Sequence, residues 1–237
     1  MNGRPPDTPR SHERDLSAAR AEILARAALP IAPPSSGLRS TRALVATIVI
    51  YAGLVIGLLG ARSEASALFG KNPVPVLLLV LSVAGLFVLG RGAISEAFGR
   101  CPSATWLAIG LAVALVALTI SALWVGNALE KPIRLGGLSR IAWQSLIVAL
   151  VAAYSEELLF RGVLWTAIAR RSTTMLRPLI QTSAIFAIAH VIGPAGLAEL
   201  PHRAIAGVLF GLLRWKSDSL WPGMHAHFCV NAIVMTA

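Results

Sequence analysis

The chain has 237 residues, of which 56% are hydrophobic and 14% are charged, and its formal net charge is +10. Soluble domains carry about 25% charged residues, so this composition excludes an ordinary water-soluble domain as well as a disordered or disulfide-rich chain. The two cysteines, Cys101 and Cys229, form no CxxC motif, which excludes a cysteine-based zinc or redox site. The composition predicts an all-α fold, a polytopic bundle of transmembrane helices. The positive charge then indicates loops held near anionic lipid, and we expect no nucleic-acid partner.

Residues 1–42 form a polar and basic segment that precedes the apolar part of the chain. It carries seven arginines, four acidic residues and two proline pairs. The stretch from Asp15 to Leu29 is able to form a short amphipathic helix, but we favour a disordered cytosolic tail. The charged region is too long for a cleavable signal peptide. The expected organisation is therefore a tail at 1–42 and a transmembrane domain at 43–237.

Seven apolar segments follow Arg42, separated by charged residues. A membrane-spanning helix needs about 20 mainly apolar residues. Because backbone polar groups in lipid must bond internally, and because no period-two alternation marks a barrel, we expect helices. The sixth segment is short and is interrupted by His202 and Arg203. The expected spans, about seven in number, are 43–61, 72–90, 101–129, 141–169, 178–198, 200–213 and 219–237.

The distribution of Lys and Arg predicts the orientation of these spans. With a cytoplasmic N-terminus, 14 of the 21 Lys and Arg residues fall on the cytoplasmic side and six on the other. The remaining one, Arg161, lies inside a span. Cytoplasmic loops of membrane proteins carry such an excess of positive charge. The sequence therefore predicts a cytoplasmic N-terminus and an extracytoplasmic C-terminus.

Three charged side chains, those of Glu156, Glu157 and Arg161, lie in the middle of the fourth predicted span. An ionisable group at the bilayer centre costs about 2.5–3.5 kcal/mol on insertion scales. Glu157 and Arg161 are one helical turn apart and can form an ion pair, so a purely positional role for these two stays open. Glu156 has no partner in the local sequence and points about 100° away from Glu157. A functional role is therefore the better interpretation of Glu156.

Two further spans contain polar side chains. His190 lies one turn after Phe186, and His227 lies one turn before Asn231; taken singly, such residues more often pack or join helices. At about 1.5 Å per residue from the nearest cytoplasmic charge, Glu156 and His190 lie about 20 Å deep and His227 about 14 Å deep. Three helices would thus bring these groups to similar depths. The remaining histidines, which we expect to be bystanders, are His12, His202 and His225.

These residues fall into three motifs in chain order: EExxxR at 156–161, FxxxH at 186–190 and HxxxN at 227–231. In this order they resemble the motifs of the CAAX protease and bacteriocin-processing (CPBP, or Abi) family of intramembrane endopeptidases, and segment 205–213 is also similar to that family. The resemblance covers about residues 145–237 and leaves the first four spans without a motif. It implies an intramembrane peptide hydrolase. Its implied catalytic residues are Glu156, Glu157, Arg161, His190, His227 and Asn231.

The residue types in these motifs suit hydrolysis by an activated water. Glu156 would take a proton from the water while His190 helps to hold it, and His227 and Asn231 would donate to the developing oxyanion. The resemblance allows both a glutamate-type mechanism without metal and a metal-dependent one. The cofactor is therefore either none or a divalent metal such as zinc, with Glu156, His190 and His227 as candidate ligands. The HExxH motif of many zinc proteases is absent.

The resemblance also bears on substrate and location. It implies a membrane-embedded or lipidated protein or peptide as substrate. The high Ala and Arg content fits a bacterium, where prenylated CaaX proteins are not normally present, so we expect a bacterial membrane peptide and an inner-membrane location. The alternative function is a non-enzymatic transporter or scaffold, in which mid-membrane Glu and His serve proton or solute binding. The absence of an internal repeat between the halves disfavours that alternative.

Overall fold

The computed structural model describes residues 38–61, 74–128, 143–191 and 196–236. Contacts divide the chain into units at 1–33 and 34–237, and only the second contains described residues. The choice between a disordered tail and an amphipathic helix lies outside the described residues, as do the lysines and arginines between 62 and 73 and between 129 and 142. The described part of the chain is helical, without a strand beyond one isolated bridge between Gly99 and Ser219. The predicted all-α fold is confirmed.

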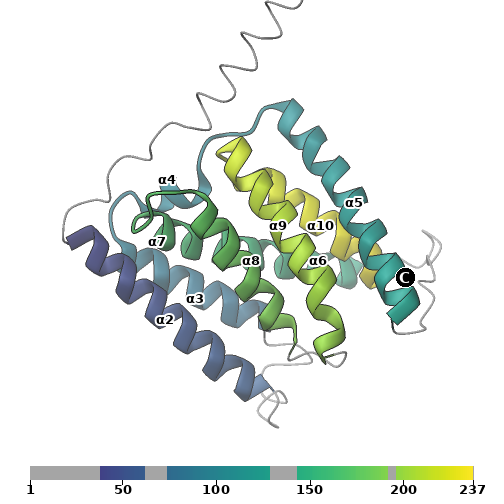
Figure 1. Cartoon of the computed structure of the whole chain (residues 1–237), viewed down its shortest axis with the longest axis horizontal. Coiled ribbons are helices and arrows are strands. Elements are labelled where there is room, and N and C mark those ends of the chain that lie inside the picture. The colour runs from purple at the N-terminus through teal and green to yellow at the C-terminus, as the bar shows by residue number, and fades with distance from the viewer. Residues whose placement is uncertain (1–37, 62–73, 129–142, 192–195, 237) are drawn as a thin grey trace, which may run out of the picture. The chain divides into compact units, whose positions relative to one another are not determined.

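The helices follow the predicted apolar segments closely, and Figure 1 shows their arrangement. In chain order they are α2 (Leu38–Ala61), α3 (Val74–Leu89), α4 (Ala93–Phe98), α5 (Ala104–Ala128), α6 (Trp143–Glu157), the π-helical segment η3 (Leu158–Leu164), α7 (Trp165–Ala169), α8 (Leu176–His190), the 3-10 segment η4 (Gly196–Glu199), α9 (Leu200–Ser217) and α10 (Trp221–Thr236). The fourth predicted span corresponds to α6, η3 and α7 in unbroken succession.

Three boundaries differ from the predictions. Helix α2 begins at Leu38, before the expected boundary at residue 43. Its N-terminal end includes the basic residues Arg39 and Arg42, which the prediction had assigned to the tail. Helix α8 ends at His190, well before the end of the predicted span 178–198. The short helix α4 was not predicted, since six residues hold too little periodicity to be recognised.

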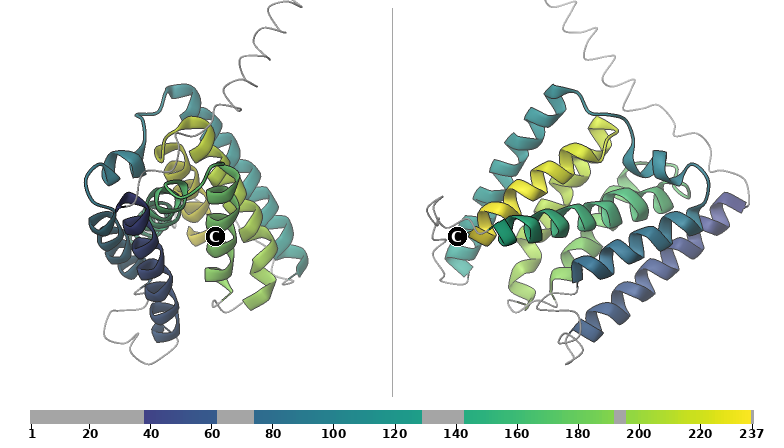
Figure 2. Two further views of the ribbon diagram at one scale, coloured as in Figure 1. Left: turned by 60° about the vertical axis from the view of Figure 1, so that its left-hand side comes forward. Right: turned by 180° about the vertical axis from the view of Figure 1, so that it is seen from behind.

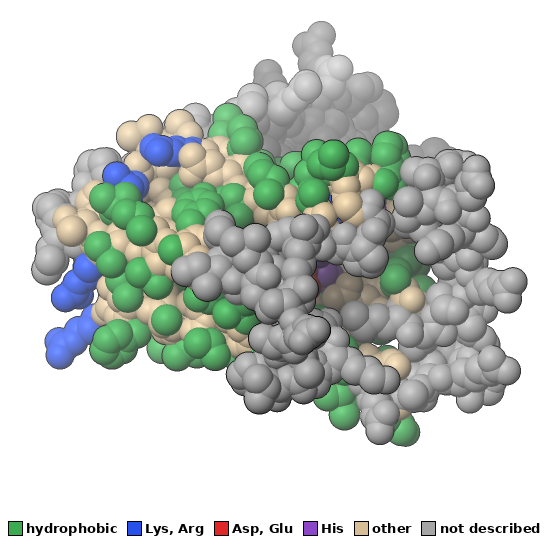
Figure 3. Space-filling model, turned by 90° about the horizontal axis from the view of Figure 1, so that it is seen from below, with side chains coloured by type: hydrophobic (Ala, Val, Ile, Leu, Met, Phe, Trp, Pro, Cys, Tyr) green, Lys and Arg blue, Asp and Glu red, His purple; other side chains and the backbone are tan. Residues whose placement is uncertain are grey.

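Two helical segments are long and apolar enough to cross a membrane, namely Ala104–Trp124 and Gly196–Ser217. The second of these segments contains the sixth predicted span, 200–213. It is longer than predicted, because η4 precedes the span and one further helical turn follows Leu213. Ser40–Leu54 and Val74–Leu89 are shorter apolar helices. Large apolar side chains are also exposed over much of the surface, as the green areas of Figure 3 illustrate. Exposed apolar surface of this extent marks contact with lipid or with other proteins.

The segment η3 lies at the centre of the packing, in contact with α3, α4, α8 and α9. Around it, α2 pairs with α3, α8 with α9, and α10 with α5 and α6, as Figures 1 and 2 show. The core on one side of η3 contains Ile50, Leu89 and Phe160, all buried. Single π-helical turns within α-helices are rare and often occur at functional sites. Here the π-helical turns begin directly after the paired glutamates.

Glycines on α9 allow that helix to approach α8 closely. A Cβ added to Gly207 would lie 3.1 Å from both Cα and Cβ of Ser183, and one added to Gly211 would lie 2.5 Å from a Leu179 methyl carbon. The two helices therefore run antiparallel, with Gly207 opposite Ser183. This approach also brings the Gly207 carbonyl to the centre of the bundle.

We expect Gly207→Ala to destabilise the protein, because the added methyl group meets backbone atoms of α8 that cannot move independently. Overpacking of this kind costs about 1–3 kcal/mol. Thermal unfolding in detergent measures the effect, and Val208→Ala, at an exposed position of the same helix, is the control, with a change within about 0.5 kcal/mol. Equal stability of Gly207→Ala and the wild type would mean that α8 and α9 are not in close contact.

Candidate active site

Glu157 lies at the end of α6 and joins two other helices. Its Oε1 accepts a hydrogen bond of 2.7 Å from Nη1 of Arg161 and one of 2.9 Å from Nδ1 of His227. Nη2 of Arg161 donates to the carbonyl oxygen of Gly207 at 3.2 Å. The side chains of Glu157 and Arg161 are both 0% exposed. A single buried carboxylate thus holds α10 and the π-helical segment in register, while Arg161 connects them to α9.

Aromatic rings enclose this ion pair. The Arg161 guanidinium carbon lies 4.2 Å from the ring centroid of Phe186, a cation–π distance. The ring of Phe210 stacks on His227 with a centroid separation of 5.0 Å and an interplanar angle of 24°. On the remaining side is Gly223, where an added Cβ would lie 3.3 Å from Oε2 of Glu157. Rings and glycine together exclude other groups from the pair and fix the plane of His227.

Glu156 has a different environment from its neighbour. Its Oε2 is buried and has no hydrogen-bond partner among the described residues. The same oxygen lies 3.7 Å from Nε2 of His190 and 3.7 Å from Nε2 of His227. These distances are too long for direct hydrogen bonds, so the three atoms stay available to a water lying beside them. The side chains of Glu156 and His190 are 15% and 20% exposed, against 2% for His227.

The hydrogen bonds of the two imidazoles fix which ring nitrogen faces Glu156. Nδ1 of His190 lies 2.7 Å from the carbonyl oxygen of Phe186. Because a carbonyl only accepts, this Nδ1 carries the proton and donates. Nδ1 of His227 donates in the same way to the Glu157 carboxylate. Both Nε2 atoms are therefore directed at Glu156, one from α8 and one from α10.

The structure brings together five of the six predicted site residues, which are Glu156, Glu157, Arg161, His190 and His227. The sixth, Asn231, lies one turn beyond His227 on α10, half-buried, and its side chain makes no hydrogen bond to another described residue. The neighbours Phe210, Gly207 and Gly223 were not predicted as site residues. Aromatic and glycine positions carry no chemical signature of their own, and segment 205–213 stood out only through its resemblance to the family.

The histidines expected to be bystanders have distinct places. His225 donates from Nδ1 to the carbonyl of Trp221 at 2.7 Å and lies 3.5 Å from the Tyr154 hydroxyl. Neither contact involves Glu156. His202, in the first turn of α9, is buried, and its Nδ1 has no hydrogen-bond partner among the described residues. His12 is outside the described residues.

Within the described ranges, no group of three or more His, Cys, Asp and Glu side chains is placed to hold a metal ion. Glu156, His190 and His227 approach one another pairwise without forming such a group. The metal-dependent alternative therefore stays a prediction from the sequence, and no step below is routed through a metal.

Residues 138–233 match a family model described as type II CAAX prenyl endopeptidase Rce1-like. The matched segment contains all six predicted site residues, from Glu156 to Asn231. The match makes this segment similar to the CAAX protease family, over less than half of the 237-residue chain. The family resemblance of the three motifs is thus confirmed, and the family supports peptidase activity in a membrane. Searches among curated proteins and among solved structures gave no match.

The matched segment takes up the second part of the fold. Its first described helix is α6, and its last is α10. Helices α2 to α5 precede it. Helix α3 packs against α6 and η3, and α2 packs against η3 and α7. Helix α5 packs against α9 and α10. The preceding helices therefore pack against the matched segment, and none of their residues belongs to the predicted catalytic set.

Proposed function

We propose that the protein is an intramembrane endopeptidase that hydrolyses a peptide bond in a membrane-associated protein or peptide. The observation that carries this proposal is the unpartnered Oε2 of Glu156, which lies 3.7 Å from the Nε2 atoms of two histidines on separate helices. A carboxylate without a fixed partner, flanked by imidazoles, is suited to take a proton from water and return it to a leaving group. The match to the family model supports the same reaction class.

The proposed reaction has two steps. A water held between Glu156 and His190 attacks the peptide carbonyl carbon as Glu156 accepts one of its protons, so that a C–O bond forms and the carbonyl oxygen becomes an oxyanion. The C–N bond then breaks, and Glu156 gives the proton to the departing amine. The products are a new carboxylate and a new amine. His227, when protonated at Nε2, and the amide of Asn231 stabilise the oxyanion by hydrogen bonding.

Glu157 and Arg161 act as positioning residues in this mechanism. The hydrogen bond from Nδ1 of His227 to Glu157 orients the imidazole, as a buried carboxylate behind a catalytic histidine does. Arg161 in turn fixes the carboxylate. The sequence left a purely positional role open for this pair. The contacts support such a role, with His227 as the residue that Glu157 orients.

Cleavage of a membrane peptide by the purified protein tests the proposal against the transporter alternative. The protease predicts defined peptide fragments from wild-type protein in detergent, where no gradient exists. A transporter predicts pH-coupled flux in sealed vesicles and no fragments. Mass spectrometry of the peptide pool and a vesicle flux assay separate the two functions.

Metal dependence is decided by analysis of the active protein. The glutamate-type mechanism predicts that cleavage persists after treatment with a strong chelator and that metal content is far below one equivalent. Stoichiometric zinc, lost together with activity on chelation and restored with it, would instead assign Glu156, His190 and His227 as ligands. Elemental analysis and cleavage rates on one preparation give the answer.

We further propose seven spans with a cytoplasmic N-terminus, in a bacterial inner membrane, with a membrane-embedded or lipidated peptide as substrate. The excess of Lys and Arg on one side supports this orientation. Reporter fusions truncated after Gly90 and after Leu129 measure it. We expect a cytoplasmic reporter to be active at Gly90 and an extracytoplasmic one at Leu129. The reverse pattern would invert the topology.

A further inference from the structure

Basic residues gather at one end of the described helical bundle. This end is formed by the segments on either side of α4, by the connection from α7 to α8 and by the end of α9, and it lies toward the upper left of Figure 1. Among the described residues of this end, Glu96 and Asp218 are the only acidic ones. The basic residues of the same end are Arg91, Arg100, Arg170, Arg171, Arg177, Arg214 and Lys216.

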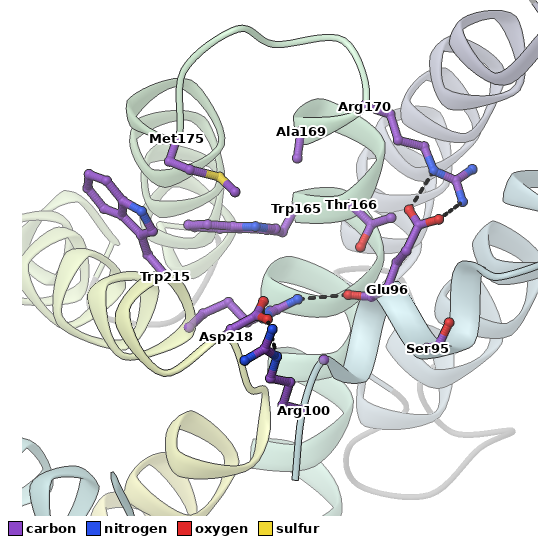
Figure 4. A pocket seen from close by; sticks show the side chains of 12 residues that line it. Ser95, Glu96, Arg100, Trp165, Thr166, Ala169, Arg170, Met175, Trp215 and Asp218 are labelled. Atoms are coloured by element: carbon purple, nitrogen blue, oxygen red, sulfur yellow. Dashed lines mark hydrogen bonds and ion pairs between the residues drawn. The ribbon is translucent and has the colours of Figure 1, made fainter. Parts of the chain in front are cut away.

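An open cavity of about 430 Å³ lies among these charges, and Figure 4 shows it from close by. Its volume is in the range of about 300–1,000 Å³ that is usual for small-ligand sites. The side chains of Arg170 and Glu96 lie on one side of it, and the rings of Trp165 and Trp215 lie on the other. No member of the predicted catalytic set lines this cavity.

The carboxylates that line the cavity are already paired with arginines. Glu96 accepts two hydrogen bonds from Arg170, of 2.8 and 2.9 Å, one at each carboxylate oxygen. The two carboxylate oxygens of Asp218 lie 3.3 Å from Nε of Arg100 and 3.5 Å from Nη1 of Arg214. Every carboxylate oxygen of the cavity therefore faces a guanidinium, which disfavours a cationic ligand.

Hydrogen-bond donors, in contrast, are in excess. The side chain of Arg100 is 83% exposed, and the two Nη groups of its guanidinium have no hydrogen-bond partner among the described residues. Arg214 is held rigidly beside it, because its side chain donates to the backbone carbonyls of Arg161 and Glu96. A guanidinium binds phosphate through several charge-assisted hydrogen bonds. The cavity thus combines one fixed and one available arginine for an anion.

The place of the cavity along α8 indicates where this anion comes from. Helix α8 begins directly after Met175, a residue of the cavity lining. Over about three turns from there, one face of α8 exposes apolar side chains at every fourth position, namely Leu176, Ile180, Ala184 and Ile188. Such a face suits contact with acyl chains, whereas Trp, Lys and Arg mark the headgroup level of a membrane protein. The cavity therefore lies at the level of lipid phosphates.

We propose that this cavity binds the phosphate of an anionic membrane-lipid headgroup. The phosphate oxygens accept hydrogen bonds from the free Nη groups of Arg100, and Arg214 supplies a fixed positive charge. The ring of Trp215 packs against the glycerol, and an acyl chain lies along the exposed face of α8. Basic pockets between membrane helices are known to bind anionic headgroups. A soluble phosphate offers the same oxygens without the acyl chain, so a comparison of the two identifies the source.

Two substitutions in the cavity test this site, each with a matched control. Arg100→Gln removes the exposed guanidinium and leaves the buried arginines in place, and Arg91→Gln makes the same change at the same end, outside the cavity lining. Ala169→Leu fills part of the cavity without a change of charge. Ala108→Leu adds the same group at an exposed position of α5.

Native mass spectrometry of the purified full-length protein, titrated with phosphatidylglycerol or with phosphatidylcholine in detergent, measures the binding. We expect phosphatidylglycerol to be retained in preference to phosphatidylcholine. Arg100→Gln should weaken this binding by about tenfold, since a hydrogen bond to a charged group is lost. Ala169→Leu should weaken it as well, because the added methyl groups take the space of the headgroup, and both control variants should bind as the wild type does.

Equal affinity of the wild type, Arg100→Gln and Ala169→Leu for phosphatidylglycerol overturns the proposal, as does an equal loss in Arg91→Gln and Arg100→Gln. Inorganic phosphate is the second arm of the experiment. Displacement of the bound lipid by an equal concentration of inorganic phosphate would assign the cavity to a soluble phosphate compound and overturn the lipid assignment. Because lipid retention is measured without a peptide substrate, its outcome is independent of the proposed hydrolysis.

Discussion

Replacing Glu156 by Gln is expected to lower kcat/KM for a membrane peptide by about 10²–10⁴-fold, the usual contribution of a general base. The amide preserves the shape of the side chain but cannot accept the water proton. Insertion and unfolding temperature should stay close to wild type, because Oε2 of Glu156 holds no hydrogen bond that the fold depends on. Rates measured on purified protein, alongside unfolding in the same detergent, separate chemistry from folding.

Glu199→Gln is the matched control for this experiment. Glu199 is also a partly exposed carboxylate at a helix end, but it pairs with Arg203 at 3.0 Å, outside the predicted catalytic set. Its cleavage rate should match the wild type. His190→Ala combined with Glu156→Gln should be scarcely slower than Glu156→Gln alone, since residues that act as a unit are not additive. Independent, multiplying losses would assign the two residues to separate roles.

Replacing Arg161 by Met should produce a large loss of stability. The substitution keeps most of the volume but leaves the buried Glu157 carboxylate without its cation, and breaking a buried pair in this way costs about 3–5 kcal/mol. The hydrogen bond to Gly207 and the contact with Phe186 are lost as well. Thermal or denaturant unfolding in detergent measures the difference.

The pair Glu199–Arg203 provides the control, because it has the same i,i+4 spacing but is partly exposed. Arg203→Met should change stability by less than about 1 kcal/mol. Adding Glu157→Gln to Arg161→Met should restore part of the lost stability, since the uncompensated charge is removed. If Arg161→Met unfolds no more easily than Arg203→Met, the buried ion pair is not what holds α6, α9 and α10 together.

The helical segments of this fold were predictable from the sequence because charge is rare in it. The gap between Arg42 and Arg62 gave α2, and the long apolar stretch after Cys101 gave α5, each within a few residues. What the apolar pattern did not predict is local backbone geometry. The π-helical segment from Leu158 to Leu164 contains residue types that also occur in ordinary α-helices. Its sequence therefore does not distinguish the two geometries, and the segment packs against α3, α8 and α9.

Part of the candidate site was predictable, because charged and polar side chains are rare in the middle of apolar segments. Glu156, His190 and His227 stood out for that reason, and the structure brings them together. The hydrogen bond between Glu157 and His227 was not foreseen, because it joins residues 70 positions apart and depends on the angle between α6 and α10. The role of Gly223 could not be predicted from the sequence either. A larger residue there would crowd the Glu157 oxygen, which belongs to another helix.

The most direct measurement of the proposed mechanism is peptide cleavage in water enriched in oxygen-18. Wild-type protein is incubated with a membrane peptide, and the fragments are weighed by mass spectrometry. Attack by a Glu156-activated water predicts one labelled oxygen in the new C-terminal carboxylate of the wild-type product, and essentially no product from Glu156→Gln over the same time. Unlabelled fragments, or labelled product formed by Glu156→Gln at the wild-type rate, would contradict the mechanism.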